Sequence, residues 1–195
     1  RLIEQPLRDE IPIYLAAVGL KNVELTAEIA DGWLPFMYSP TKGEDIYKNS
    51  LESGFSKSGV TEKKEKFEIV TTVFGRVCEE NEIDEYLYPA RNIYTLYVGG
   101  MGAKSKNFYY NLFCEYGYED IADELQNLYL SGKKKESEQL FPKELLNELT
   151  LVGTKKDIEK KLEKWKDSNI TEISLSLPID FETVKFIKEL LWKFC

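Results

Sequence analysis

The pattern of apolar and polar positions predicts strands that alternate with helices along the chain. Residues 11–17 form an apolar run without alternation, which is typical of a parallel strand covered on both faces. The segment FEIVTTVFGRV is rich in β-branched residues and gives the clearest strand of the sequence. The predicted strands span residues 11–17, 33–37, 67–77 and 170–177.

Apolar residues at helical spacing follow each of the first two strands. Asn22 is predicted to cap a helix that the Asp-Gly pair at 31–32 closes. The Ser-Pro pair at 39–40 predicts the start of a second helix, because serine is a favoured cap and proline is tolerated in the first turn. This helix is expected to continue to Phe55.

A long helical segment separates the third and fourth predicted strands. Residues 79–150 carry successive helical patterns punctuated by GGMG and SGKKK, and no convincing strand. We therefore expect a helical insertion at 79–150 within one partial domain that comprises residues 1–195. Thr154 and Asp157 predict a capping box, and a final amphipathic helix is predicted at 180–194.

This order of elements predicts an α/β fold with a parallel sheet and right-handed crossovers. Four strands make either a small open sheet or half of a closed eight-stranded barrel, which needs about 250 residues. The 195 residues present favour half of such a barrel. Since the sequence begins with Arg1 rather than methionine, and in the polar approach to a strand, we expect a fragment.

Composition and charge indicate an ordinary globular protein. The chain is 43% hydrophobic and 31% charged, and its formal net charge of −8 disfavours nucleic acid and anionic lipid as partners. No stretch approaches the roughly 18 apolar residues of a membrane span, and no signal peptide is recognisable. We expect a cytoplasmic protein.

The sequence contains no histidine, which removes Ser-His, Cys-His and His-metal chemistry from this chain. Its cysteines, Cys78, Cys114 and Cys195, are far apart and lack the paired spacing of a zinc site or a redox dithiol. Reduced cysteines and no metal are therefore expected.

The turn between the first strand and its helix is the best candidate for a ligand site. Ligands of parallel α/β folds bind beyond the carboxyl ends of the strands. At Gly19 a ligand oxygen can approach the backbone, the start of the helix favours an anion, and Lys21 adds a positive charge. Alternatively, Gly19 only permits a tight turn and Asn22 is an ordinary cap. The spacing does not decide between them.

Two other segments are candidates for phosphate loops. The next loop, residues 34–39, places a second helix start near the first, so that both loops would share one anion. The segment VGGMGAKSKNF, residues 98–108, follows a helical pattern and lacks the GK[ST] ending of a phosphate loop. We interpret it as a hinge or a cap.

Three segments together resemble the luciferase-like monooxygenase superfamily and, within it, the oxidoreductases that depend on the deazaflavin coenzyme F420. They are PIYLAAVGLKNVELTAEIADGWLPFMYSP, TLYVGGMGAKSKNFYYNLFCEYGYED and LVGTKKDIEKKLEKW. The resemblance implies that this chain is the C-terminal half of a (β/α)8 TIM barrel, with four parallel strands and a helical insertion before the last strand.

The resemblance also implies a cofactor site at the carboxyl-terminal mouth of the barrel. The ring of F420 would lie over this mouth, and two loops would hold its phosphate. The implied cofactor-binding residues are Ala17, Val18, Gly19, Leu20, Lys21, Asn22, Leu34, Pro35, Phe36 and Met37. The implied chemistry is hydride transfer between F420 and an organic small-molecule substrate, with no catalytic acid or base assigned. Relatives often carry proline where this chain has Leu20, which gives a less rigid turn with an additional N–H.

Three alternatives remain open at this stage. Related barrels use FMN, so an FMN-dependent monooxygenase is the first. The second is a non-catalytic half-barrel that pairs with a missing N-terminal half-barrel or forms a homo-oligomer, because its sheet edges would be unpaired. A small open-sheet nucleotide binder is the third, and only its topology supports it.

Overall fold

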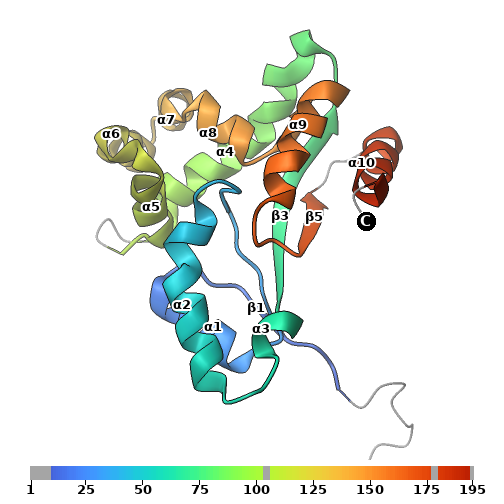
Figure 1. Cartoon of the computed structure of the whole chain (residues 1–195). Coiled ribbons are helices and arrows are strands. Elements are labelled where there is room, and N and C mark those ends of the chain that lie inside the picture. The colour runs from blue at the N-terminus through green and yellow to red at the C-terminus, as the bar shows by residue number, and fades with distance from the viewer. Residues whose placement is uncertain (1–9, 103–105, 177–179, 194–195) are drawn as a thin grey trace, which may run out of the picture.

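An all-parallel sheet organises the structure (Figure 1). The computed structural model describes residues 10–102, 106–176 and 180–193. The strands are β1 (Tyr14–Leu15), β2 (Gly32–Trp33), β3 (Glu68–Val77), β4 (Leu151–Gly153) and β5 (Glu172–Ser176). Their order is β1-β2-β3-β4, and β5 also pairs with β3. The predicted α/β fold with parallel strands is confirmed.

The central strand β3 is long enough to pair with three others. Its first residues pair with β2, residues 70–74 pair with β5, and residues 75–77 pair with β4. The four predicted parallel strands are present, and the short strand β4, which was not predicted, is a fifth. Three residues give no periodicity in a sequence, and β4 forms only because β3 extends beyond the end of β5.

The first two strands are shorter than predicted. Strand β1 covers two of the residues in 11–17, and β2 begins one residue before the predicted 33–37 and ends at Trp33. The predicted end of the last strand, Leu177, lies outside the described residues.

Helices fill most of the remaining chain, and those of the 79–150 segment lie together above α1 and α2 in Figure 1. Within the described part of 79–150 all regular structure is helical, as predicted. The helices are α1 (Leu20–Ile29), α2 (Gly43–Ser58), α3 (Lys63–Lys66), η1 (Glu80–Glu82), α4 (Ile83–Gly100), α5 (Phe108–Phe113), η2 (Cys114–Tyr118), α6 (Glu119–Leu130), α7 (Lys134–Leu140), α8 (Lys143–Glu148), α9 (Lys155–Lys166) and α10 (Phe181–Lys193). None of these described helices is both long and apolar enough to cross a membrane.

The start of α1 differs from the prediction. Gly19, not Asn22, is the N-cap, and its carbonyl accepts the N–H groups of Asn22 at 2.9 Å and of Val23 at 3.0 Å. Asn22 therefore lies in the first turn of the helix and does not cap it. The prediction failed because glycine is also an acceptable cap, and only the backbone conformation distinguishes the two residues.

The start of α2 is also later than predicted. Ser39 does accept a hydrogen bond, because its Oγ lies 3.0 Å from the backbone N of Lys42. It caps a turn, however, and the helix begins only at Gly43 and ends at Ser58 rather than at Phe55.

Two other predicted caps are confirmed. Thr154 and Asp157 form a reciprocal capping box at the start of α9, with N···O distances of 3.0 and 3.3 Å. Asp180 accepts the backbone N–H of Thr183 at 2.9 Å in the first turn of α10. The predicted last residue of this helix, Phe194, lies outside the described residues.

Helices α1 and α2 pack closely because Gly54 has no side chain. A Cβ atom at Gly54 would lie 2.2 Å from the carbonyl oxygen of Glu24 and 2.6 Å from the Cβ of Ala27. Such backbone contact fixes the separation of the two helices, and therefore the position of the first turn of α1.

A partly buried lysine joins α9 to β4. The Nζ of Lys161 donates to the carbonyl oxygen of Val152 at 2.7 Å and to the Oδ1 of Asn147 at 3.3 Å. Burial lowers the pKa of the Lys161 ammonium to about 8 from its ordinary value near 10.5.

This shift predicts a specific dependence of stability on pH. Between pH 8 and 10.5 the unfolded chain retains the Lys161 proton more strongly than the folded chain does, so folding is favoured as the pH rises through this window. The difference in unfolding free energy between the natural chain and Lys161→Met should therefore increase from pH 8 to 10.5 in urea titrations. A flat difference would contradict the lowered pKa. Lys161→Arg, which stays charged, should fall increasingly below the natural chain over the same range.

Candidate functional site

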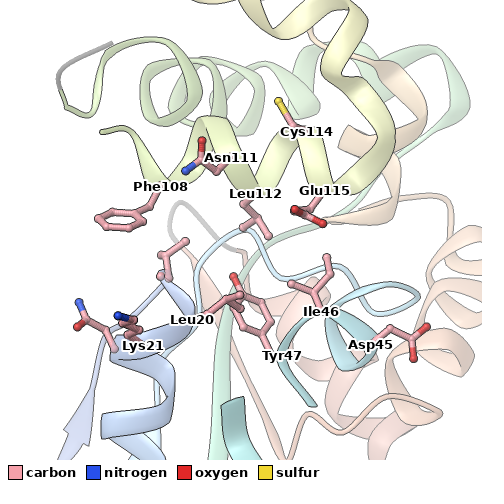
Figure 2. A pocket seen from close by; sticks show the side chains of 13 residues that line it. Leu20, Lys21, Asp45, Ile46, Tyr47, Phe108, Asn111, Leu112, Cys114 and Glu115 are labelled. Carbon is pink, nitrogen blue, oxygen red and sulfur yellow. The ribbon is translucent and has the colours of Figure 1, made fainter. Parts of the chain in front are cut away.

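A cavity of about 950 Å³ lies at the carboxyl end of β1 (Figure 2). It is bounded by the first turns of α1 and α2 and by one face of α5 and η2. Its lining consists of residues 18–22, residues 45–47, and Phe108, Asn111, Leu112, Cys114 and Glu115. The cavity therefore joins two helices that follow strands to the helical segment of residues 79–150.

The first predicted loop lies at this cavity. Residues 18–22 all line it, whereas Ala17 is buried directly before them. The carbonyl oxygen of Ala17 accepts the indole N–H of Trp33 at 2.9 Å. This hydrogen bond attaches the start of the turn to β2.

Within the second predicted loop, two residues serve packing. The carbonyl oxygen of Pro35 accepts the hydroxyl of Thr71 at 3.2 Å. Met37 is buried, has a φ of 58°, and accepts the hydroxyl of Tyr116 on its carbonyl at 2.6 Å. Neither residue lines the cavity.

The other two residues of the second loop also lie away from the cavity lining. Phe36 packs against Tyr97, with ring centroids 4.7 Å apart, and Leu34 is exposed. The structure therefore does not bring the two loops together around one anion at this cavity.

The first turn of α1 presents unpaired hydrogen-bond donors. Among the described residues, no group accepts a hydrogen bond from the backbone N–H of Leu20 or of Lys21. They point out of the positive end of the helix dipole, and the Lys21 side chain is exposed beside them. This end of the cavity favours a negatively charged group.

Tyr47 adds a third donor that the sequence did not reveal. Tyr47 as a residue is only 2% exposed, but its hydroxyl oxygen is not among the fully buried polar atoms; no described protein group bonds to it, and it is open to solvent from the cavity. The ring packs against Trp33 at 4.8 Å between centroids, and Figure 2 shows it reaching from α2 toward the side chains of α5. Burial raises the pKa of the Tyr47 phenol, so the group is protonated at neutral pH and can donate to a ligand.

The opposite end of the cavity has a different character. Asp45 and Glu115 lie there, as Figure 2 shows, and Cys114 directly precedes Glu115 in the lining. Burial raises the pKa of the Cys114 thiol, which keeps it protonated and unsuited to act as a nucleophile at neutral pH. The cavity thus has donors at one end and carboxylates at the other.

The ring of Phe108 lies against the backbone of Gly19. A Cβ at Gly19 would lie 2.8 Å from the Cε1 and 3.0 Å from the Cδ1 of the Phe108 ring. The φ of Gly19 is −68°, which any residue adopts, so the tight-turn interpretation does not account for it. The ring of Phe108 rests directly on the backbone at this position.

The glycine-rich segment before Phe108 has a packing role. Gly99 and Gly100 belong to the last turn of α4, where their missing side chains make room for the Tyr129 ring of α6. Asn107 then caps α5, because its Oδ1 accepts the N–H of Tyr109 at 2.9 Å. This agrees with a cap at one end of the segment, while residues 103–105 lie outside the described part.

Comparisons with known proteins identify a family and several relatives of the chain. The family model described as luciferase-like monooxygenase matches residues 1–172. A Mycobacterium tuberculosis protein named as a putative coenzyme F420-dependent oxidoreductase is 37% identical over 169 residues, which are 87% of this chain and 48% of that protein. The 5,10-methylenetetrahydromethanopterin reductase of Archaeoglobus fulgidus is 22% identical over 178 residues, or 91% of this chain and 52% of the reductase.

Two solved structures share the fold. The coenzyme F420-dependent tetrahydromethanopterin reductase of Methanopyrus kandleri matches with a TM-score of 0.67 at 18% identity, over 93% of this chain and 49% of that one. An F420-dependent secondary alcohol dehydrogenase, solved with an F420-acetone adduct, matches with a TM-score of 0.59 at 17% identity, over 93% and 48%. The chain spans about half the length of each of these relatives.

Alanine substitutions at two glycines should differ in their cost in unfolding free energy, because one glycine contacts rigid backbone and the other contacts a side chain that can move. Gly54→Ala places its Cβ against backbone and should lower the unfolding free energy by about 2–3 kcal/mol. Gly19→Ala meets only the exposed ring of Phe108, which can rotate away, and should cost less than about 1 kcal/mol, in line with the weaker capping by alanine. Urea unfolding of both variants provides the measurement, and equal losses would show that the ring is fixed.

Proposed function

Because the chain belongs to the luciferase-like monooxygenase family, we propose that it forms the cofactor-binding half of an oxidoreductase that transfers a hydride between coenzyme F420 and an organic substrate. The relative that is 37% identical, named as F420-dependent, supports this choice of cofactor. When bound, the deazaflavin ring would supply the hydride chemistry, and the protein would hold and orient it.

The donors around the first turn of α1 support this proposal most directly. F420 carries a phosphodiester, and an anion of this kind fits the unpaired N–H groups of Leu20 and Lys21. The Lys21 ammonium and the Tyr47 hydroxyl would contribute from either side. Tyr47 adds to these donors, because its ring is held in the wall of the cavity and its hydroxyl is open to a ligand or to water from that side.

FMN is the alternative cofactor, because its phosphate suits the same donors. The choice of F420 rests on the named relatives, and it is the part of the proposal that a titration decides directly.

We further propose that an N-terminal half-barrel completes the catalytic unit. Among the described residues, β1 pairs only with β2 and β5 only with β3, so each keeps one edge without a partner strand. Burial alternates along β3, and Val70, Thr72 and Phe74 on one face are only partly covered. The relatives are about twice as long as this chain, which matches a missing set of strands of similar size.

Titration with each cofactor tests the first proposal. The natural chain should bind F420 more tightly than FMN, monitored by the fluorescence of each cofactor. Tyr47→Phe should weaken F420 binding about five- to tenfold, since one hydrogen bond of roughly 1 kcal/mol is lost. Tyr88→Phe, an exposed tyrosine of α4 outside the cavity, is the matched control.

Each contrary result of this titration has a distinct meaning. Tighter binding of FMN than of F420, together with oxygen consumption, would show that FMN is the cofactor. Equal affinities of the natural chain and Tyr47→Phe for F420 would show that the Tyr47 hydroxyl does not bind the cofactor. Failure of the natural chain to bind either cofactor would contradict the cofactor-binding role of this chain.

Mixing experiments test the second proposal. Purified chain should form a 1:1 complex with the part of the M. tuberculosis relative that this chain does not match, as measured by sedimentation velocity. Ile13→Lys, which places a charge next to the β1 edge, should weaken this complex, whereas Leu130→Lys at the end of α6 should not. Self-association without a complex would favour a homo-oligomer, and a monomer in every mixture would contradict the proposal.

A further inference from the structure

Phe108 occupies a position for which its chemistry is unsuited. Its ring rests against Gly19, immediately before the N–H groups of Leu20 and Lys21, at the positive end of α1. An apolar ring cannot satisfy these donors. The side chain is nevertheless 54% exposed, so it gains only part of the stabilisation that burial gives a phenylalanine.

The ring of Phe108 is held less firmly than its neighbours. Tyr109, the next residue, packs its ring against Tyr97 with centroids 4.7 Å apart and also meets Phe36. Phe108 makes no ring contact with another aromatic side chain of the described chain, and it is absent from the apolar cluster that forms the core.

The backbone beneath the ring is fixed, in contrast to the ring itself. The side chain of Asn107 caps α5 through the N–H groups of Tyr109 and Tyr110 and donates to the carbonyl oxygens of Tyr97 and Val98 at 2.9 and 2.7 Å. Movement at Phe108 is therefore a rotation of the side chain, and exposed side chains rotate on a picosecond to nanosecond timescale.

We propose that the Phe108 ring is a movable cover over the anion-binding end of α1, which a phosphate group must displace to reach the N–H groups of Leu20 and Lys21. This inference rests on the proposed phosphate site. The site has two independent supports, the unpaired N–H groups of α1 and the Tyr47 side chain, which is 2% exposed and whose hydroxyl opens onto the same cavity without a partner in the described chain. The ring and the anion compete for the surface of Gly19, so the cover lowers the affinity for an anion that lacks further contacts.

Inorganic phosphate is the probe that isolates this competition from the rest of the cofactor. We would titrate the ¹⁵N-labelled chain with phosphate and follow the backbone N–H signals of residues 20–22. Phe108→Ala should lower the dissociation constant about three- to tenfold, and Phe108→Leu should lie between. Met101→Ala, which removes another exposed apolar side chain between α4 and α5 that does not line the cavity, should behave like the natural chain.

Two results would overturn the inference. Equal dissociation constants for the natural chain and Phe108→Ala would show that the ring does not cover the site. The absence of any shift at residues 20–22 in both proteins would show that there is no anion site to cover. The spectrum of each variant also reports whether it is folded.

A parallel F420 titration separates this inference from the proposed function. If F420 binds while phosphate affinity is unaffected by Phe108→Ala, the cofactor assignment stands and the cover does not. If phosphate binds more tightly to Phe108→Ala while F420 does not bind, the cover stands and the cofactor assignment fails.

Discussion

The hydrogen bond from the indole N–H of Trp33 to the carbonyl oxygen of Ala17 is the contact on which the site depends. It joins the end of β2 to the turn that leads from β1 into α1. Trp33 is fully buried, so without this bond two polar groups would be left unsatisfied in the core, at a cost of about 1–3 kcal/mol each. The same indole packs against Tyr47. One side chain therefore sets the position of both the α1 turn and the Tyr47 hydroxyl across the cavity.

The second loop serves the fold rather than the cavity. Ser39 and Thr41 both donate to the carboxylate of Glu148 at the end of α8, and the hydroxyl of Tyr116 accepts from the backbone N of Ser39 at 3.0 Å. These bonds connect the segment after β2 to two separate helices of residues 79–150. Strand β4, directly after that segment, ties it to β3 as well. The helical segment is therefore fastened at both its middle and its end.

The sequence predicts this architecture where the signals are local. Strand β3 and the capping box of Thr154 follow from β-branched composition and from a fixed spacing, and both are confirmed. Strand β4 escapes prediction because it depends on the length of a distant strand. The Gly19 turn can be selected as a candidate because a strand, a glycine and a helix are adjacent in the sequence.

The rest of the candidate site arises from tertiary structure. Tyr47 falls at an ordinary apolar position of a helix, and nothing near it marks its hydroxyl as unpartnered. Phe108 is about ninety positions from Gly19 in the sequence, and their contact exists only in the folded chain, where the start of α5 meets the start of α1. An alignment of local motifs cannot show such a pair, because the information lies in how two distant elements meet.

The division of the cavity between α1, α2 and the α5–η2 face has a thermodynamic consequence. A molecule bound there contacts two parts of the chain, the α1–α2 pair and the α5–η2 face. Ligand binding and the packing of the helical segment against α1 and α2 are therefore thermodynamically linked. A bound ligand stabilises this packing, and the packed arrangement in turn favours ligand binding. Local unfolding of α5 would empty the cavity, and a bound molecule would slow hydrogen exchange in helices that it does not touch.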